Sequence, residues 1–262
     1  MTARLTRRAG ALTLIAAAAA VLTGCDGVIG AKLTYDDTEK VKVTEIVVTG
    51  GSGNVQVKTA AIGETHIKRV VRGGTSDPGV SYRLSGTTLT VDTSCGLDCH
   101  ASYEIEAPTG VAVRGTLHSG NLDLLAVASA DVSVTSGEIH IEGATGEVKA
   151  KSTSGNIVVN GLAGPATLIA TSGNIEALEL TGGGAIRADA SSGNVDLLLR
   201  QPATVTAGAT SGNVDLAVPA GSYKIVEQVG AGNFDSQVRS DPKATQVLTV
   251  RTSSGNATIR AL

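Results

Sequence analysis

The chain has 262 residues, of which 42% are hydrophobic, 17% charged and 2% aromatic, and its formal net charge is −3 at pH 7. Because it holds one Phe, no Trp and 33 Gly, small and β-branched side chains must fill the interior, which favours short strands and tight turns over large helices. The charge is not basic, and no aromatic residues alternate with Lys or Arg, so we expect no nucleic-acid partner.

Residues 1–24 have the features of a secretory signal peptide: three arginines precede an apolar run, 9–22, that is too short to span a bilayer comfortably. LTGC at 22–25 resembles the lipobox of bacterial lipoproteins. The resemblance implies cleavage before Cys25 and lipidation of its sulfur, and two or three acyl chains hold a protein on a membrane. The mature chain would then carry a formal charge of −6. A signal peptide with an incidental Cys is the alternative.

Residues 25–43 are polar and show no strong periodicity, so we expect a tether between the lipid and the folded domain. From Thr44 onward, apolar and polar residues alternate as in half-buried strands. The expected domain therefore covers residues 44–262, with a less regular β-rich part at 44–116 and regular repeats at 117–262.

Two cysteines, Cys95 and Cys99, lie in the sequence SCGLDCH. Outside the cytoplasm such a close pair predicts a disulfide. A metal site is the alternative, but it would need two further ligands, and beside the adjacent His100 the sequence holds no other Cys or His cluster.

A phrase of the form Ser-Gly-Asn-apolar-x-apolar recurs along the chain. Its glycines and asparagines are Gly53, Asn54, Gly120, Asn121, Gly137, Gly155, Asn156, Gly173, Asn174, Gly193, Asn194, Gly212, Asn213, Gly232, Asn233, Gly255 and Asn256, with Glu138 in place of one Asn. From Gly120 onward the glycines are spaced by 17 to 23 residues. A near-constant period of this size predicts a solenoid.

The residues two and four positions after each glycine are apolar with one exception, Ser236, and those between them are mostly polar. This period of two predicts a strand with one inward face, and a second alternating strand follows in each repeat. An antiparallel meander is the alternative, but a barrel of that many strands would leave an apolar lumen too wide to fill. We therefore expect an all-β parallel β-helix in which each repeat forms one coil.

In a β-helix the phrase has a structural explanation. Glycine supplies a corner with positive φ at little steric cost, and Ser would help to satisfy its polar groups. Asn tolerates the left-handed conformation and bonds to backbone, and stacked copies can bond to one another. A repeated corner is a more economical interpretation than nine active sites.

The repeats and the segment SYEIEAPTGVAVRG at Ser102–Gly115 resemble the bacterial "putative adhesin" domain family of unknown function. The resemblance covers about Val43 to Leu262. It implies a right-handed β-helix on an envelope-exposed or membrane-anchored protein, and it supplies no catalytic residues.

An acidic row is the remaining chemical candidate. Glu176, Asp196, Asp215 and Asp235 are expected at equivalent outward positions of four successive coils. A solvated face is the favoured interpretation. The last three are candidates for a divalent-metal site, because hard cations bind several oxygen ligands. Paired carboxylates also serve glycoside hydrolases, but no aromatic neighbours are available here to hold a sugar ring.

The sequence thus predicts a lipid-anchored, non-enzymatic β-solenoid on the extracytoplasmic face of a bacterial membrane, acting as an adhesin-like interaction or scaffold module without a cofactor. Its partners would be the membrane and an envelope protein or glycan. An envelope-stress or signalling accessory and a polysaccharide-processing enzyme are the alternatives. The strand-like segment 256–260 is expected to form the last, uncovered coil, and the chain to be a monomer or weak dimer.

Overall fold

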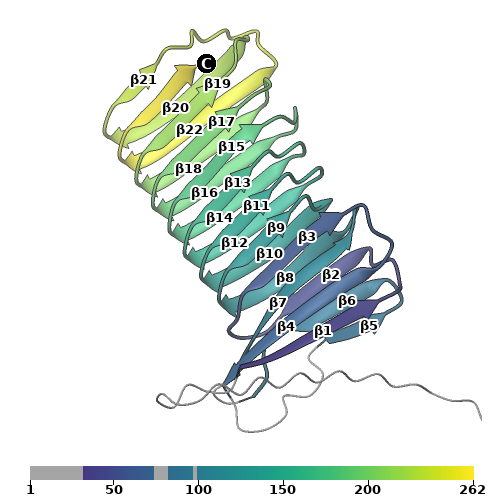
Figure 1. Ribbon diagram of the computed structural model, residues 1–262. Helices are drawn as coiled ribbons and strands as arrows, with labels where there is room; N and C mark the ends of the chain where they lie inside the picture. Colours follow the sequence, from purple (N-terminus) through teal and green to yellow (C-terminus); the bar gives the residue numbers. More distant parts are fainter. Residues whose placement is uncertain (1–31, 74–81, 97–98) are drawn as a thin grey trace, which may run out of the picture.

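The computed structural model describes residues 32–73, 82–96 and 99–262, and these form a two-sheet β-solenoid (Figure 1). Every regular element in the described ranges is a strand, so the expected all-β solenoid is confirmed. Within these ranges no helix has the length and hydropathy to cross a membrane.

Sheet A has 12 strands. In spatial order they are β1 (Lys32–Glu39), β4 (Thr65–Gly73), β7 (Cys99–Pro108), β3 (Val55–Ala60), β9 (Leu122–Leu125), β11 (Ile139–Glu142), β13 (Ile157–Asn160), β15 (Ile175–Leu180), β17 (Val195–Leu199), β19 (Val214–Val218), β23 (Ala257–Ala261) and β21 (Phe234–Ser236).

Sheet B has 11 strands. In spatial order they are β20 (Tyr223–Ala231), β22 (Gln246–Ser254), β18 (Val205–Ser211), β16 (Ile186–Ser192), β14 (Ala166–Ser172), β12 (Val148–Ser154), β10 (Ser129–Ser136), β8 (Ala112–Ser119), β2 (Glu45–Thr49), β6 (Thr88–Asp92) and β5 (Tyr82–Ser85).

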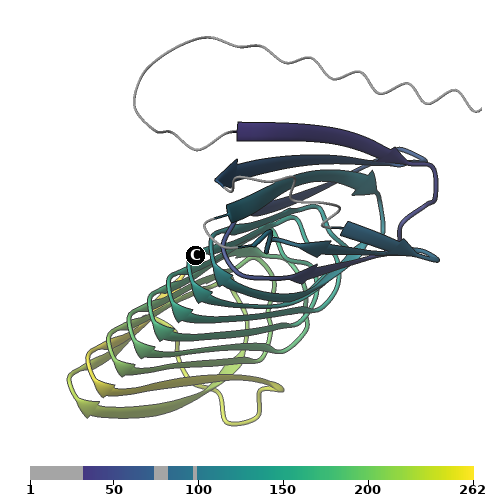
Figure 2. The ribbon, with the colours of Figure 1, turned by 90° about the horizontal axis from the view of Figure 1, so that it is seen from below.

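Each coil of the regular region consists of one strand of sheet B, a Ser-Gly corner and one strand of sheet A. Neighbouring coils pair in parallel and in register, so that Ile175 lies beside Val195 and Val195 beside Val214. Equivalent residues therefore form straight rows along the solenoid. Figure 2, a view from below, shows the coils stacked behind one another.

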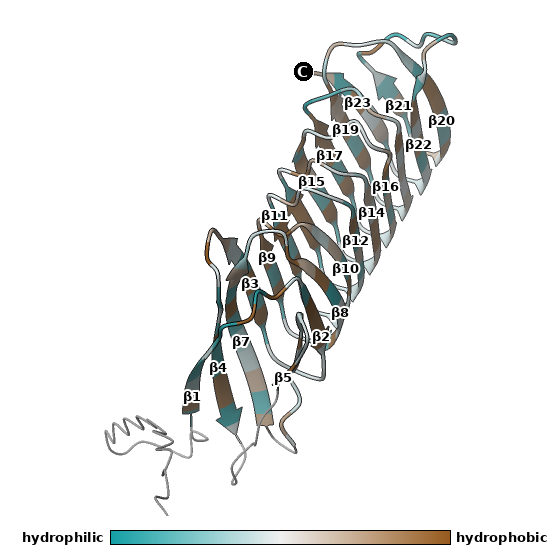
Figure 3. Ribbon diagram, turned by 90° about the vertical axis from the view of Figure 1, so that its right-hand side faces the viewer, coloured by the Kyte–Doolittle hydropathy of each residue, from teal (hydrophilic) through white to brown (hydrophobic). Residues whose placement is uncertain are grey.

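The core lies between the two sheets. The expected inward residues of the regular coils are buried, among them Ile157, Val195 and Leu216, each at most 1% exposed. Figure 3 shows apolar residues throughout the coil strands. The exceptions are Phe234 and Ser236 of β21, which are only half-buried because this strand belongs to the end coil.

At the C-terminal end the spatial order of the coils differs from their order in the sequence. The coil of β22 and β23 lies between the coil of β18 and β19 and the coil of β20 and β21. The expectation that 256–260 forms an uncovered last coil is therefore wrong. The edge strands are β20 and β21, and the connection that follows β21 covers the start of β20, where Ser240 Oγ accepts a hydrogen bond from the Ile225 amide (3.0 Å).

The side chains explain this arrangement. In the inserted coil, Leu248, Val250 and Ile259 are completely buried. In the end coil the inward row instead holds Glu227, which pairs in register with Val250 and is exposed. A carboxylate at an inward position has to reach water, so this coil is tolerated only at the end of the stack, where it also discourages further strand addition.

The N-terminal end has the same kind of insertion. β2 and β3 lie between β8 and β9 on one side and β6 and β7 on the other. Beyond them the pairing becomes antiparallel: β4 pairs with β7, and β5 with β6. This agrees with the less regular sequence pattern of residues 44–116.

The expected tether is corrected from Lys32 onward, because β1 pairs antiparallel with β4 over its whole length. Sequence patterning missed this strand because none of its residues is buried and six of the eight are exposed, so no apolar alternation marks it. Residues 1–31, which include Cys25 and the predicted signal peptide, lie outside the described residues.

Aromatic residues close this N-terminal end. Arg69 is 5% exposed and is the register partner of Tyr103 on β7. Its guanidinium lies 4.2 Å from the ring centroid of Tyr35 on β1. Across the opening, the Tyr82 hydroxyl donates to Glu39 Oε1 (3.2 Å), and burial, followed by nearby carboxylates, raises the pKa of Tyr82 to about 12. Large polar-tipped side chains thus cover the core where the repeats end.

Candidate functional site

The glycine of every Ser-Gly-Asn phrase forms a corner. All nine phrase glycines have positive φ, for example +149° at Gly173 and +147° at Gly193. A Cβ atom placed on Gly193 would lie 2.1 Å from the carbonyl oxygen of Gly173 in the neighbouring coil. Two independent constraints, backbone conformation and coil-to-coil approach, therefore require glycine at this corner.

The asparagines form a ladder along the same edge. In each step the side-chain Oδ1 accepts a hydrogen bond from the backbone N–H of the equivalent residue in the next coil. The donor–acceptor pairs are Asn121–Asn54, Glu138–Asn121, Asn174–Asn156, Asn194–Asn174, Asn213–Asn194, Asn256–Asn213 and Asn233–Asn256, at 2.8–3.1 Å. The ladder follows the spatial order of the coils, because Asn256 of the inserted coil lies between Asn213 and Asn233.

The serines of the phrase do not share this role. Ser154, Ser172, Ser192 and Ser211 are exposed, and among the described residues their hydroxyl groups make no hydrogen bond. The expectation that Ser helps to satisfy the corner is therefore wrong for these hydroxyl groups, which face the solvent. The serine main chain does contribute, because its carbonyl accepts a hydrogen bond from the glycine N–H of the neighbouring coil, as from Gly155 to Ser172 (2.9 Å).

The acidic row is shorter than expected. Glu176, Asp196 and Asp215 are register neighbours on β15, β17 and β19, but Thr258 of the inserted coil separates Asp215 from Asp235. Partial burial, and then the charge of Asp215, raise the pKa of Asp196. In the part of the chain that the structure describes, no three His, Cys, Asp or Glu side chains form a group able to hold a metal ion.

The cysteines and the histidines that lie near carboxylates are spread along the described part of the molecule. Cys95 and Cys99 are joined by a disulfide beside the N-terminal coils. His66 lies 3.6 Å from Glu64, and His140 lies 3.7 Å from Asp123 on a different part of sheet A. These exposed pairs are far apart in the strand order, so the structure does not bring the titratable candidates together into one site.

Sequence patterning missed an open trough on the outer face of sheet B. Two hollows, of about 430 and 670 Å³, meet at Ile169 and together extend from β8 to the end coil. Arg114 lies at one end and Arg251 near the other. The repeat places residues 116 to 208 of the trough in consecutive coils, but the join to Arg251 depends on the inserted coil, which no sequence pattern indicated.

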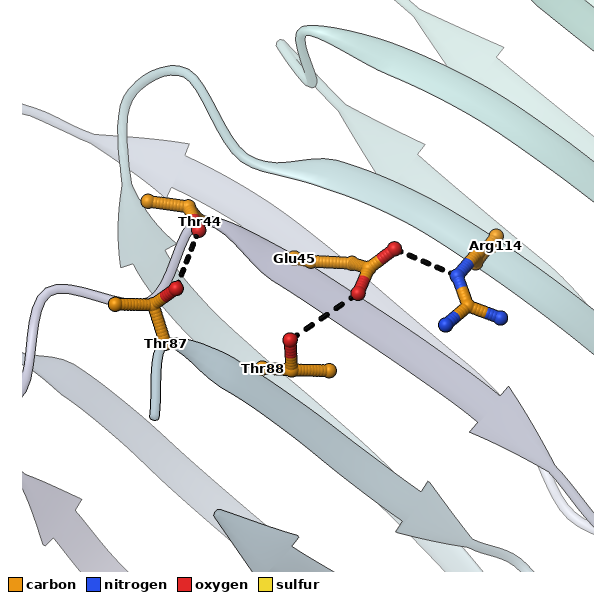
Figure 4. A network of polar contacts seen from close by, with 5 residues as sticks. All are labelled: Thr44, Glu45, Thr87, Thr88 and Arg114. Atoms are coloured by element: carbon orange, nitrogen blue, oxygen red, sulfur yellow. Dashed lines mark hydrogen bonds and ion pairs between the residues drawn. The ribbon is translucent and has the colours of Figure 1, made fainter. Parts of the chain in front are cut away.

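The start of the trough is fixed by a small polar network (Figure 4). Arg114 Nε donates to Glu45 Oε1 (2.6 Å), and Thr88 Oγ1 donates to the other oxygen of the same carboxylate (3.1 Å). The hydrogen bond from Arg114 lowers the pKa of Glu45. The two side chains come from β2 and β8, so the inserted N-terminal coil holds the first cation of the trough in place.

The fold and the corner array define a class of protein, a two-sheet solenoid built on a repeated Gly-Asn corner. The family model named Toastrack DUF4097 matches residues 26–260, and the chain belongs to this family.

Two solved structures are similar to the chain. One is described as a "putative adhesin" from Bacteroides fragilis, with 16% identity, a TM-score of 0.41 and coverage of 90% of this chain and 100% of that one. The other, described as a "putative cell adhesion protein" from Clostridium sporogenes, has 11% identity, a TM-score of 0.24 and coverage of 88% and 100%. No curated protein matches the chain.

Proposed function

We propose that this protein is a lipid-anchored, non-enzymatic interaction module on the extracytoplasmic face of a bacterial membrane. The observation that carries the proposal is the use of the repeated residues: Gly and Asn of the phrase serve the corner, while the two sheet faces stay open to solvent along the whole stack. Such a rod presents extended surfaces to a partner, as in other solenoids.

The distribution of reactive side chains supports a non-enzymatic role. A nucleophile needs a base within hydrogen-bonding reach, and glycoside hydrolysis needs two carboxyl groups facing one sugar. Here the exposed serines lie in one row at the corner and the acids in another on sheet A. Glu176 and Asp235 are exposed, which suits a solvated face.

The anchor and the interaction are tested separately. The LTGC sequence predicts that Cys25→Ser leaves an uncleaved precursor or releases the protein from membranes, as shown by fractionation and detergent-phase partitioning. Processing and partitioning unchanged in the mutant would contradict the anchor.

For the interaction, cross-linking in intact cells followed by affinity purification of wild-type protein should recover a reproducible envelope component. A solenoid that cross-links to nothing above the level of an unrelated lipoprotein would contradict the proposed function. Turnover of purified envelope glycans by the wild-type protein would contradict the non-enzymatic role.

A further inference from the structure

We infer that the trough on the outer face of sheet B binds an extended anionic glycan lying parallel to the solenoid axis. The inference deepens the proposed function and rests on it, because it names the class of partner. It is carried by the shape of the trough, the charge on its two rows and the hydroxyl groups along its rim.

The trough is one continuous row of register partners. From β8 to β20 its central row reads Thr116, Ser133, Lys151, Ile169, Asp189, Gly208, Arg251 and Gln228. All eight line the two hollows. At about 4.8 Å per strand the row is roughly 34 Å long, which suits a linear polymer rather than a small molecule.

The two faces of the solenoid differ in charge. Outward residues of β9–β19 on sheet A include five acids and no Lys or Arg: Asp123, Glu142, Glu176, Asp196 and Asp215. The central row of sheet B and the row beside it instead carry five basic residues and two acids: Arg114, Lys149, Lys151, Arg187, Arg251, Asp131 and Asp189. Arg114 and Lys149 are paired with Glu45 and Glu147, at 2.6 and 3.0 Å. The positive charge that can steer an anion therefore lies at the remaining basic residues of the central row and its neighbour.

Two positions of the trough keep positive charge that no carboxylate balances. Lys151 is exposed and has no ion-pair partner among the residues that the structure describes. Two strands away, Asp189 is shared by two guanidinium groups, with Arg187 Nε at 2.7 Å and Arg251 Nη2 at 3.3 Å. The cluster of Arg187, Asp189 and Arg251 therefore has a net charge of one cation. It lies about 10 Å from Lys151 at the strand spacing.

Gly208 lies beneath the ion pair that joins its two neighbours in the row. It is buried, and an added Cβ would lie 2.7 Å from Asp189 Oδ1 and 3.7 Å from Arg251 Nε. The missing side chain therefore leaves room for the contact between Asp189 and Arg251, which crosses this strand and forms the floor of the trough.

The lining favours a glycan over other linear polyanions. Ser191, Thr210 and Ser253 provide exposed hydroxyl groups along one rim, suited to hydrogen bonds with sugar hydroxyls. Neither hollow is lined by an aromatic side chain, and single-stranded nucleic acids depend on aromatic stacking. A peptide strand has no free edge to join, because the strands of the trough up to β22 pair on both sides.

Binding of fluorescent polygalacturonate, a uronate polymer, to the purified full chain in detergent tests the inference. Lys151→Glu should weaken binding about tenfold, whereas Lys58→Glu, the same charge change on exposed sheet A, should leave it within twofold. Gly208→Leu should weaken binding by a similar factor, and Thr206→Leu, on the same strand in the adjacent outward row, should not. Unchanged thermal unfolding confirms that all four variants are folded.

Three controls decide the outcome. Binding that falls as salt rises, with no binding of neutral dextran, supports the inference. Equal binding of dextran, poly-glutamate or oligothymidylate, or equal losses in the sheet A variants, would overturn it. If wild type binds no polygalacturonate but still cross-links to an envelope component, the proposed function stands and only this inference fails.

Discussion

The regular middle of the solenoid and its two ends are built by different rules. From β8 to β19, coils that follow one another in the sequence are also neighbours in space, and each has a glycine corner with positive φ. At each end one coil lies between two coils that follow one another in the sequence: β2 and β3 at the N-terminal end, and β22 and β23 at the C-terminal end. The middle is a regular repeat, whereas each end of the stack is closed by strands that depart from that repeat.

The difference shows what limits a solenoid. Any coil with apolar inward rows can extend the stack, so the middle has no intrinsic end. The C-terminal end coil stops growth with Glu227 in an inward row, and the N-terminal end with antiparallel strands and a covered Arg69. Both devices protect strand edges that would otherwise recruit other chains.

The largest expected effect on stability comes from exchanging one inward residue between the inserted coil and the end coil. Val250 and Glu227 are register partners, but Val250 is completely buried between two coils. Val250→Glu should destabilise the protein by about 4 kcal/mol or more, because it buries an unpaired charge. Glu227→Val should change stability by less than about 1 kcal/mol. Chemical denaturation measures both, and a larger effect at Glu227 would mean that the coil order is wrong.

A smaller effect separates a stacked corner from an unstacked turn. Gly193 and Gly86 both have positive φ, but a Cβ on Gly193 would strike a backbone carbonyl and one on Gly86 would meet nothing within 4 Å. Gly193→Ala should therefore cost about 3 kcal/mol or more, and Gly86→Ala about 1 kcal/mol. Ser192→Ala, at an exposed hydroxyl, should cost least. Similar losses for both glycines would show that stacking adds nothing to the corner.

The smallest effect concerns the acidic row. Because burial and Asp215 raise the pKa of Asp196, the folded state binds this proton more tightly than the unfolded chain does. Its stabilising contribution is complete below the ordinary Asp pKa and is lost as pH rises through the raised pKa. Asp196→Asn should thus raise the free energy of unfolding at pH 7 by less than about 1 kcal/mol, seen as a slightly higher melting temperature. At pH 3 it should have no such effect.

Asp235→Asn is the matched control for this effect, because Thr258, not a carboxylate, lies beside Asp235. This substitution should leave the melting temperature unchanged at both pH 7 and pH 3. A gain equal to that of Asp196→Asn would contradict the separation of Asp235 from the acidic row.

The sequence predicts the coil well and the order of coils poorly. Inward positions such as Val195 follow from alternation within one repeat, and the corner follows from Gly and Asn at a fixed period. The insertion depends on which coil best tolerates water, and its one local sign is Glu227 within the alternation of Ile225 and Val229. Strand β1 left no such sign, because none of its residues is buried.

The trough could not be predicted for a related reason. Asp189 and Arg251 form an ion pair across 62 positions of sequence, and they lie two strands apart only because the last coil is inserted. A residue row across sheet B is a property of coil order. The repeat period places the row from Thr116 to Gly208, but it carries no information about the continuation to Arg251 and Gln228.

Cross-linking of β18 tests the coil order most directly. Thr206 of β18 is the register partner of Thr249 on β22, and Val226 of β20 lies one strand further out. All three lie in the same outward row. The variant Thr206→Cys/Thr249→Cys should form a disulfide under mild oxidation, detected by peptide mapping, since parallel partners lie within disulfide reach. Thr206→Cys/Val226→Cys should not. A disulfide in the second variant and none in the first would contradict the inserted coil.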